Sequence, residues 1–146
     1  MARLTESITI AAPVEKVFLR CDDPHAMPLY VPSVTSVSDV KRSEKRLGDT
    51  FRVTYGMLGS HFDEDFTYTE YERNKKIKAS FDGAMKGTMG ITLEPHGGST
   101  KATLDTEYEV SHGVLGKAAN KLLFERVNEK NAARLLENLK IVCELI

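Results

Sequence analysis

The chain has 146 residues and a formal net charge of −1, a length that suits a single domain over residues 1–146. Charges of both signs are interspersed, so nothing favours nucleic acid or an anionic membrane surface as a partner. No stretch approaches the ~20 apolar residues of a membrane span, and the two cysteines lack C-x-x-C spacing. The first residues carry no signal-like apolar run. We therefore expect a cytoplasmic protein without an integral membrane segment.

The chain begins with a predicted strand that is followed by two short helices. Residues 4–10 alternate apolar and polar side chains, which is typical of a half-buried strand. Pro13 suits the first turn of a helix, and apolar residues at helical spacing follow it. Pro24 ends this helix, because the residue before a proline avoids the helical conformation. A second short helix is predicted over about residues 24–30.

Six further strands follow, separated by turn residues. Their apolar and polar side chains alternate, so one face of the sheet is expected to be dry and the other solvated. Short connections, such as the one that contains Gly97 and Gly98, favour hairpins and therefore antiparallel neighbours. The predicted strands cover residues 34–40, 51–55, 62–68, 77–81, 85–93 and 102–108.

The last third of the chain, from about residue 113 to residue 143, predicts one long helix. On a wheel of about 100° per residue its main apolar stripe falls within one arc. Leu122, Glu125 and Glu129 fall inside the same arc. A lone helix after a series of strands buries its stripe against the sheet, and a helix too long to lie flush leaves a cavity beneath it. The sequence thus predicts an α+β fold with an apolar internal cavity.

The segments APVEKVF…DDPHAMPLYVPSV and GVLGKAANKLLFERVNEKNAARLLENLKIVCE resemble START-like proteins, also called the SRPBCC superfamily. Within it, the polyketide cyclase/dehydrase and lipid-transport branch is the most similar. The resemblance covers essentially the whole chain and implies a helix-grip fold. In that fold a seven-stranded antiparallel sheet wraps round a long C-terminal helix, with two short helices after the first strand. It also implies a cavity for lipids, sterols, hormones, quinones or polyketides, but it assigns no catalytic residue.

The candidate ligand-binding residues are those that the predicted faces turn toward the cavity. The tyrosines among them offer an apolar ring and one hydroxyl, which suits the few polar points of an apolar pocket. Ordinary core packing is the alternative for these tyrosines. No motif for a metal or a cofactor occurs, and we expect neither. The candidates are Tyr55, Phe62, Glu64, Phe66, Tyr68, Phe81, Met89, Leu104, Tyr108, Leu122, Glu125 and Glu129.

Three of these candidates are carboxylates in apolar surroundings: Glu64, Glu125 and Glu129. An ionised carboxylate in such a place costs several kcal/mol unless a cation pairs with it, and otherwise its pKa rises. Under the pocket hypothesis these groups contact a ligand's polar end or move its protons. Under the alternative the helix overhangs the sheet and leaves Glu125 and Glu129 in water, and a strand bulge turns Glu64 outward.

His61, Asp63 and Asp65 alternate and so share the outer face of one strand. Imidazole and carboxylates are metal ligands, but a solvated strand face opposite Arg52 or Lys78 explains the pattern better.

A second apolar cluster on the long helix consists of Leu123, Phe124 and Val127, which oppose the inner stripe. Such a cluster is either covered by another element or exposed for a partner. The hairpin at residues 56–60, with Met57 and Leu58 at its tip, is one candidate cover, and a second copy in a homodimer is the other.

The leading hypothesis is binding or transport of a hydrophobic small molecule, such as a lipid, quinone or polyketide-like compound, in the internal cavity. The alternative is a cyclase or dehydratase that acts on a polyketide-like or aromatic substrate. In that enzyme a cavity carboxylate is the base and tyrosine hydroxyls stabilise an enolate. A third class is a regulatory module that binds a partner through the tip of the hairpin at residues 56–60 together with the second apolar cluster.

Overall fold

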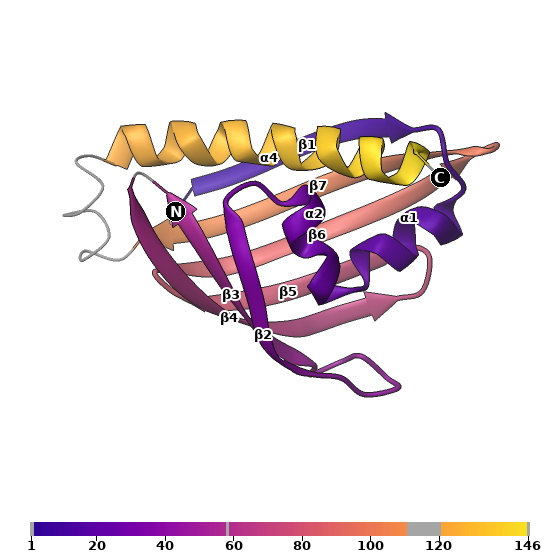
Figure 1. Cartoon of the computed structure of the whole chain (residues 1–146). Helices are drawn as coiled ribbons and strands as arrows, with labels where there is room; N and C mark the ends of the chain where they lie inside the picture. Colours follow the sequence, from indigo (N-terminus) through magenta and orange to yellow (C-terminus); the bar gives the residue numbers. More distant parts are fainter. Residues whose placement is uncertain (1, 58, 111–120, 146) are drawn as a thin grey trace.

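A seven-stranded antiparallel sheet curves around one long C-terminal helix (Figure 1). The computed structural model describes residues 2–57, 59–110 and 121–145. The elements in chain order are β1 (Ala2–Ile10), α1 (Val14–Cys21), η1 (Pro24–Ala26), α2 (Met27–Tyr30), β2 (Val34–Lys41), β3 (Thr50–Met57), β4 (Ser60–Glu72), β5 (Lys76–Gly83), β6 (Met85–His96), β7 (Ser99–Val110) and α4 (Lys121–Glu144).

The strands lie in the order β1-β7-β6-β5-β4-β3-β2, and every neighbouring pair is antiparallel. Strands β2 to β7 therefore follow one another as hairpins, and β1 completes the sheet by pairing with β7. The short helices follow β1, and α4 crosses the inner face of the sheet (Figure 1). This arrangement confirms the helix-grip fold that the sequence predicted.

The predicted second helix is divided in two, into η1 and α2. Asp23 caps η1, because its side chain accepts a hydrogen bond from the backbone of His25. Pro28 has no N–H to donate to the carbonyl of Pro24, so one continuous α-helix cannot form across this segment. The break places Met27 and Tyr30 against the inside of the molecule, where both are buried.

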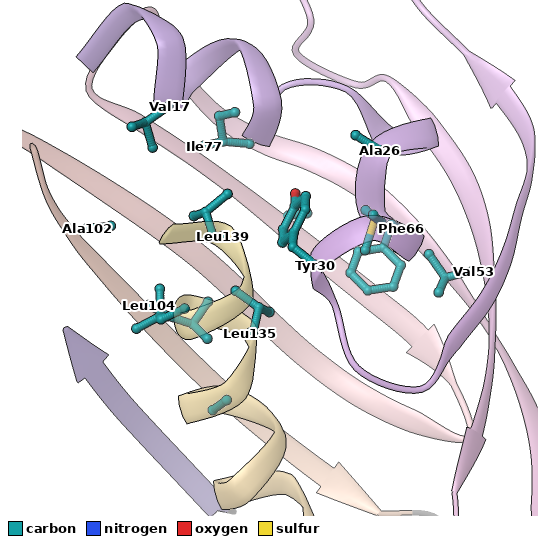
Figure 2. Packing of buried hydrophobic residues seen from close by; sticks show 14 of the residues in the cluster. Val17, Ala26, Tyr30, Val53, Phe66, Ile77, Ala102, Leu104, Leu135 and Leu139 are labelled. Atoms are coloured by element: carbon teal, nitrogen blue, oxygen red, sulfur yellow. The ribbon is translucent and has the colours of Figure 1, made fainter. Parts of the chain in front are cut away.

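The C-terminal half of α4 packs closely into the core. Leu136, Leu139 and Cys143 are almost completely buried, and Figure 2 shows Leu139 among side chains from the sheet and the short helices. Asn138 donates a hydrogen bond to the carbonyl of Tyr30 at 3.2 Å, which ties α4 to α2. The predicted first turns of the helix, residues 113–120, lie outside the described residues. No helix in the described part of the chain is both long and apolar enough to cross a membrane.

Aromatic side chains form a row across the inner face of the sheet. Phe51, Phe66 and Phe81 lie opposite one another on β3, β4 and β5, with ring centroids 5.1 and 5.3 Å apart. The next position in this row is Gly87 on β6, and the one after it is Tyr108 on β7. Because Gly87 contributes no side chain, the row has a gap between Phe81 and Tyr108.

Gly83 and Gly87 also permit unusually close approaches between strands. A Cβ added to Gly83 would lie 2.2 Å from the carbonyl oxygen of Asp63, and one added to Gly87 would lie 1.9 Å from that of Glu107. Any side chain at these positions would therefore force the strands apart. Gly83 lies directly opposite Glu64, so the tight end of β5 determines what surrounds that carboxyl group.

The end of α1 is fixed by a buried carboxylate. Asp22 accepts a hydrogen bond from the hydroxyl of Tyr71 at 3.0 Å and forms ion pairs with Arg42 and Arg46 at 3.5 and 3.4 Å. These contacts join α1 to the connection between β2 and β3 and to β4. They close the end of the core that lies beneath the short helices.

The two edges of the sheet differ. The pairing of β2 with β3 is interrupted by register shifts between Val34 and Ser36 and between Ser38 and Lys41, and Asp39 has a positive φ of 52°. The opposite edge, β1, pairs regularly with β7 and lies beside α4 (Figure 1).

Replacing Gly87 by alanine is expected to destabilise the fold by about 1–3 kcal/mol, because β6 and β7 must separate to accept the new Cβ. Gly90→Ala on the same strand is the control, since its Cβ would meet only ordinary contacts at 3.5 Å or more. We expect that control to be neutral or slightly stabilising. Urea unfolding measures both values, and equal stability of the two variants would contradict the close approach at Gly87.

Candidate functional site

A cavity of about 130 Å³, here called the first cavity, lies between the sheet and the part of α4 that precedes its packed half. Its wall combines the inner faces of the strands with residues from α2, from the segment that follows α2, and from α4. The cavity is not sealed, because Pro32, Val34 and Asn131 in its wall are partly exposed. The lining residues are Leu4, Met27, Val31, Pro32, Val34, Val53, Tyr55, Glu64, Phe66, Phe81, Met85, Met89, Leu104, Thr106, Tyr108, Asn128, Asn131, Ala132 and Leu135.

Glu64 supplies the one carboxyl group among these lining residues. The alternation of β4 turns it inward between Phe62 and Phe66, and only 4% of the residue is exposed. Its Oε2 accepts hydrogen bonds from the Tyr55 hydroxyl at 3.2 Å and from the Met85 backbone N–H at 3.1 Å. The Met85 N–H reaches this oxygen because β6 begins immediately after the tight end of β5.

Burial raises the pKa of Glu64 to about 7, although the hydrogen bonds from Met85 and Tyr55 lower it in part. Near neutral pH both the protonated and the ionised forms are therefore populated. Within the described residues no group hydrogen-bonds the second oxygen, Oε1, which leaves it for a ligand. Glu64 can thus donate a hydrogen bond to a ligand oxygen or accept one from a ligand O–H.

The hydroxyl of Tyr108 is a second polar group in the wall of the first cavity. It is buried and makes no hydrogen bond of good geometry with any described residue. Burial raises the pKa of Tyr108, and the nearby amide of Asn128 lowers it in part. That amide also lies 3.7 Å from the sulfur of Met85. A buried hydroxyl without a good partner is unfavourable, so a ligand group that bonded it would be stabilised.

Most of the residues that the strand pattern selected do line a cavity. A smaller neighbouring cavity, here called the second cavity, is lined by Tyr68, whose hydroxyl lies 3.5 Å from the carbonyl of Asp22. Phe62 is buried beside Tyr55, with ring centroids 5.6 Å apart, but it lines neither cavity. The predicted residues in the wall of the first cavity are Tyr55, Glu64, Phe66, Phe81, Met89, Leu104 and Tyr108.

The described start of α4 does not place Leu122, Glu125 and Glu129 in the wall of either cavity. Leu122 is 58% exposed, Glu129 is also exposed, and Glu125 is partly exposed, which is the arrangement of the alternative in which these carboxylates meet water. The inner face at this level carries Asn128 and Asn131 instead. Because these residues are polar, the sequence does not mark the inner face at the start of α4 as apolar. The helical-wheel prediction extended the apolar stripe of the C-terminal half into this region. That stripe is rotated by about a quarter turn from the face that lines the cavity.

The sequence reasoning also missed other lining residues. Thr106 was placed on the dry face of β7 but was not chosen as a ligand contact, although its spacing from Leu104 and Tyr108 requires it to be there. Met27 and Val31 come from the short-helix segment, which carries no periodic signal long enough to show which side faces the sheet. Met85 was overlooked as a contact of Glu64, because that contact is made by its backbone.

The outer face of the sheet holds ion pairs. Asp65 binds the guanidinium of Arg52 at 2.9 Å, and Asp63 accepts a hydrogen bond from Thr54 at 2.7 Å. Among the described residues, no three His, Cys, Asp or Glu side chains are placed to hold a metal ion. The alternation that includes His61 is therefore explained by a solvated strand face.

The second apolar cluster does not form one outward surface in the described structure. Val127 is partly buried and packs against the core, whereas Leu123 is 40% exposed. The side chain of Phe124 lies outside the described residues, as do those of Met57 and Leu58 at the tip of the hairpin. The predicted cover over this cluster thus falls on residues that the structure does not describe.

A family model described as polyketide cyclase / dehydrase and lipid transport matches residues 1–144. No curated protein sequence matches the chain.

Solved structures resemble the fold over nearly its whole length. A protein from Thermus thermophilus has a TM-score of 0.80 at 19% identity, with 97% of each chain covered. A START superfamily protein from Mycobacterium smegmatis has a TM-score of 0.73 at 19% identity, covering 96% of this chain and 98% of the other. An aromatase/cyclase from a Streptomyces species has a TM-score of 0.77 at 13% identity, covering 98% of this chain and 93% of the other. At these identities the similarity concerns the fold.

The pKa of Glu64 predicts a pH dependence of stability. Between the ordinary value of 4.5 and about 7, the folded state retains a proton that the unfolded chain has released. The free energy of unfolding should therefore fall as pH rises through this range and level off above it, by about 3 kcal/mol in all. Urea unfolding at several pH values measures it.

Glu64→Gln keeps the shape and removes the titration, so its stability should vary less between pH 4.5 and pH 7 than that of the wild type. Glu94→Gln, at an exposed position, is the control and should behave as the wild type does. A difference between wild type and Glu64→Gln that is constant over this range would contradict the burial of the carboxyl group.

Proposed function

The chain belongs to the polyketide cyclase / dehydrase and lipid transport family, and from this premise we propose that it binds a small apolar molecule with an uncharged polar end in the first cavity. The family has a hydrophobic ligand-binding fold. The single observation that carries the proposal is a largely apolar cavity whose wall holds a buried carboxyl group and a hydroxyl that makes no hydrogen bond of good geometry with any described residue.

The size of the cavity supports a ligand with a single ring at this position. The first cavity measures about 130 Å³, and an apolar cavity of about 150 Å³ in another protein admits benzene. A ligand of about nine non-hydrogen atoms that gained about 0.6 kcal/mol per atom would bind with a free energy near −5 kcal/mol, or a Kd of a few tenths of a millimolar. Binding tests should therefore cover micromolar to millimolar concentrations.

The charges of the wall support an uncharged polar end. No lysine, arginine or histidine is among the described lining residues, so a ligand carboxylate would find no cation there. It would instead meet Glu64, whose ionised fraction would repel it. A phenol or ketone has neither difficulty, because Glu64 and Tyr108 can each donate or accept a hydrogen bond.

The two cysteines are free and support a reducing location such as the cytoplasm. Burial is the main cause that raises the pKa of Cys21 and of Cys143. Thiols with raised pKa values react slowly, and this pair is consistent with a purely packing role.

We expect 4-ethylphenol to bind at pH 7.5 and 4-ethylbenzoate to bind at least tenfold more weakly, as measured by isothermal titration calorimetry. In Glu64→Gln the two affinities should approach one another, because the repelling charge is absent. Glu94→Gln should retain the wild-type ratio. Equal affinities of the two compounds for the wild-type protein would contradict the proposed selectivity.

A second candidate function is a cyclase or dehydratase, favoured by the pKa of Glu64 near 7. A carboxyl group with such a pKa at the wall of a cavity suits proton transfer at neutral pH. In this reading the ionised Glu64 removes a proton from the carbon next to a ligand carbonyl. The hydroxyl of Tyr108 donates a hydrogen bond to the resulting enolate.

Deuterium exchange separates the two functions. If the protein is an enzyme of this kind, the methyl protons of acetophenone should exchange with D₂O faster in the presence of the protein than in the same D₂O buffer without it. Glu64→Gln should remove this acceleration. A carrier should bind acetophenone without accelerating exchange. NMR measures both the binding of acetophenone and the rate of its exchange. Accelerated exchange that persists in Glu64→Gln would exclude Glu64 as the base.

A further inference from the structure

The second cavity, of about 60 Å³, lies under the short helices. It adjoins the first cavity, because six residues line both. These six come from α2, the residue that follows it, β4, β6, β7 and α4, and they form the boundary between the two spaces. The shared residues are Met27, Val31, Phe66, Met89, Leu104 and Leu135.

The two cavities differ in the charged and amide side chains of their walls. The wall of the first contains the carboxyl group of Glu64 and the amides of Asn128 and Asn131. No charged or amide side chain lines the second cavity among the described residues; its polar residues are Tyr30, Tyr68 and Cys21, and it is also lined by Ile77 and Ala79 of β5. The remaining wall is apolar, so a hydrocarbon chain that filled the space would gain contacts with it.

The boundary contains two methionines, Met27 on α2 and Met89 on β6. Methionine side chains are unbranched and flexible, and they fill irregular gaps without fixing one shape. Figure 2 shows Phe66, Leu104 and Leu135, which belong to the same boundary, projecting into the interior from different elements. Rotation of these flexible side chains would open a path for a chain between the two cavities.

We infer that the two cavities form one site for an amphiphile, whose uncharged polar ring occupies the first cavity while a short apolar chain passes Met27 and Met89 into the second. This inference rests on the proposed function. It adds that the ligand has a tail, that the tail lies opposite the polar end of the ring, and that its length is limited by the small volume of the second cavity, about 60 Å³.

The 4-alkylphenols from 4-methylphenol to 4-hexylphenol test the inference, because the chain points directly away from the hydroxyl. In the wild-type protein the affinity should rise about fourfold for each carbon that enters the second cavity. The rise should stop once the cavity is full. Isothermal titration calorimetry gives the Kd of each compound, and thermal unfolding shows that each variant is folded.

Two buried alanines provide matched variants, one in each cavity: Ala79 in the second and Ala132 in the first. In Ala79→Leu the affinity should no longer rise with the length of the alkyl chain, because the new side chain fills the second cavity. Ala132→Leu should weaken every member of the series, because it fills the space of the ring. Ser80→Leu adds the same side chain to the outer face of the strand that carries Ala79, and should reproduce the wild-type curve.

The outcomes distinguish the inference from the function on which it rests. If 4-methylphenol does not bind the wild-type protein, the proposed function fails and the inference fails with it. If 4-methylphenol binds and the longer homologues bind no more tightly, the inference alone is overturned. Should Ala79→Leu fail to fold, Ile77→Val provides a second test, because it enlarges the second cavity by one methyl group. In this variant the chain length at which the affinity stops rising should increase by about one carbon.

Discussion

A strongly curved sheet and one straight helix cannot fill the same concave space, and the first cavity follows from that mismatch. Protein interiors are otherwise close-packed, and the C-terminal half of α4 meets this standard at Leu136 and Leu139. Nearer its start, α4 crosses the part of the sheet where Gly87 leaves a gap in the row of side chains between Phe81 and Tyr108. The first cavity is therefore a consequence of how the sheet curves beneath this part of the helix.

The polar chemistry of the interior depends on the same curvature. A buried carboxyl group needs hydrogen-bond donors, and Glu64 finds one on its neighbouring strand in Tyr55 and the other in the backbone of Met85. The second donor is in reach only because Gly83 lets the end of β5 close against β4. Both of these hydrogen bonds end on the same oxygen, Oε2, so the packing of the sheet determines which atom of this carboxyl group is held by the described residues.

The alternation along the strands predicted which residues face inward more accurately than the apolar stripe of the long helix did. A strand alternates with a period of two, so a correct strand gives the correct face, and Tyr55, Glu64 and Tyr108 were found in this way. A helical stripe is defined only by its apolar residues, and it failed at the start of α4, where Asn128 and Asn131 occupy the inner face. The second cavity could not be predicted at all, because its boundary assembles single residues from elements that are distant in the sequence.

The irregular edge of the sheet has a consequence for how copies of this protein meet. An open sheet ends in strands whose backbone groups can recruit a further strand, and long regular edges invite such stacking. At β2 the register shifts and the left-handed backbone of Asp39 interrupt the ladder that an incoming chain would need, and at β1 the neighbouring helix limits access to the edge. Cross-molecular strand addition is thereby disfavoured at both margins, which protects a hollow protein from sheet-driven aggregation.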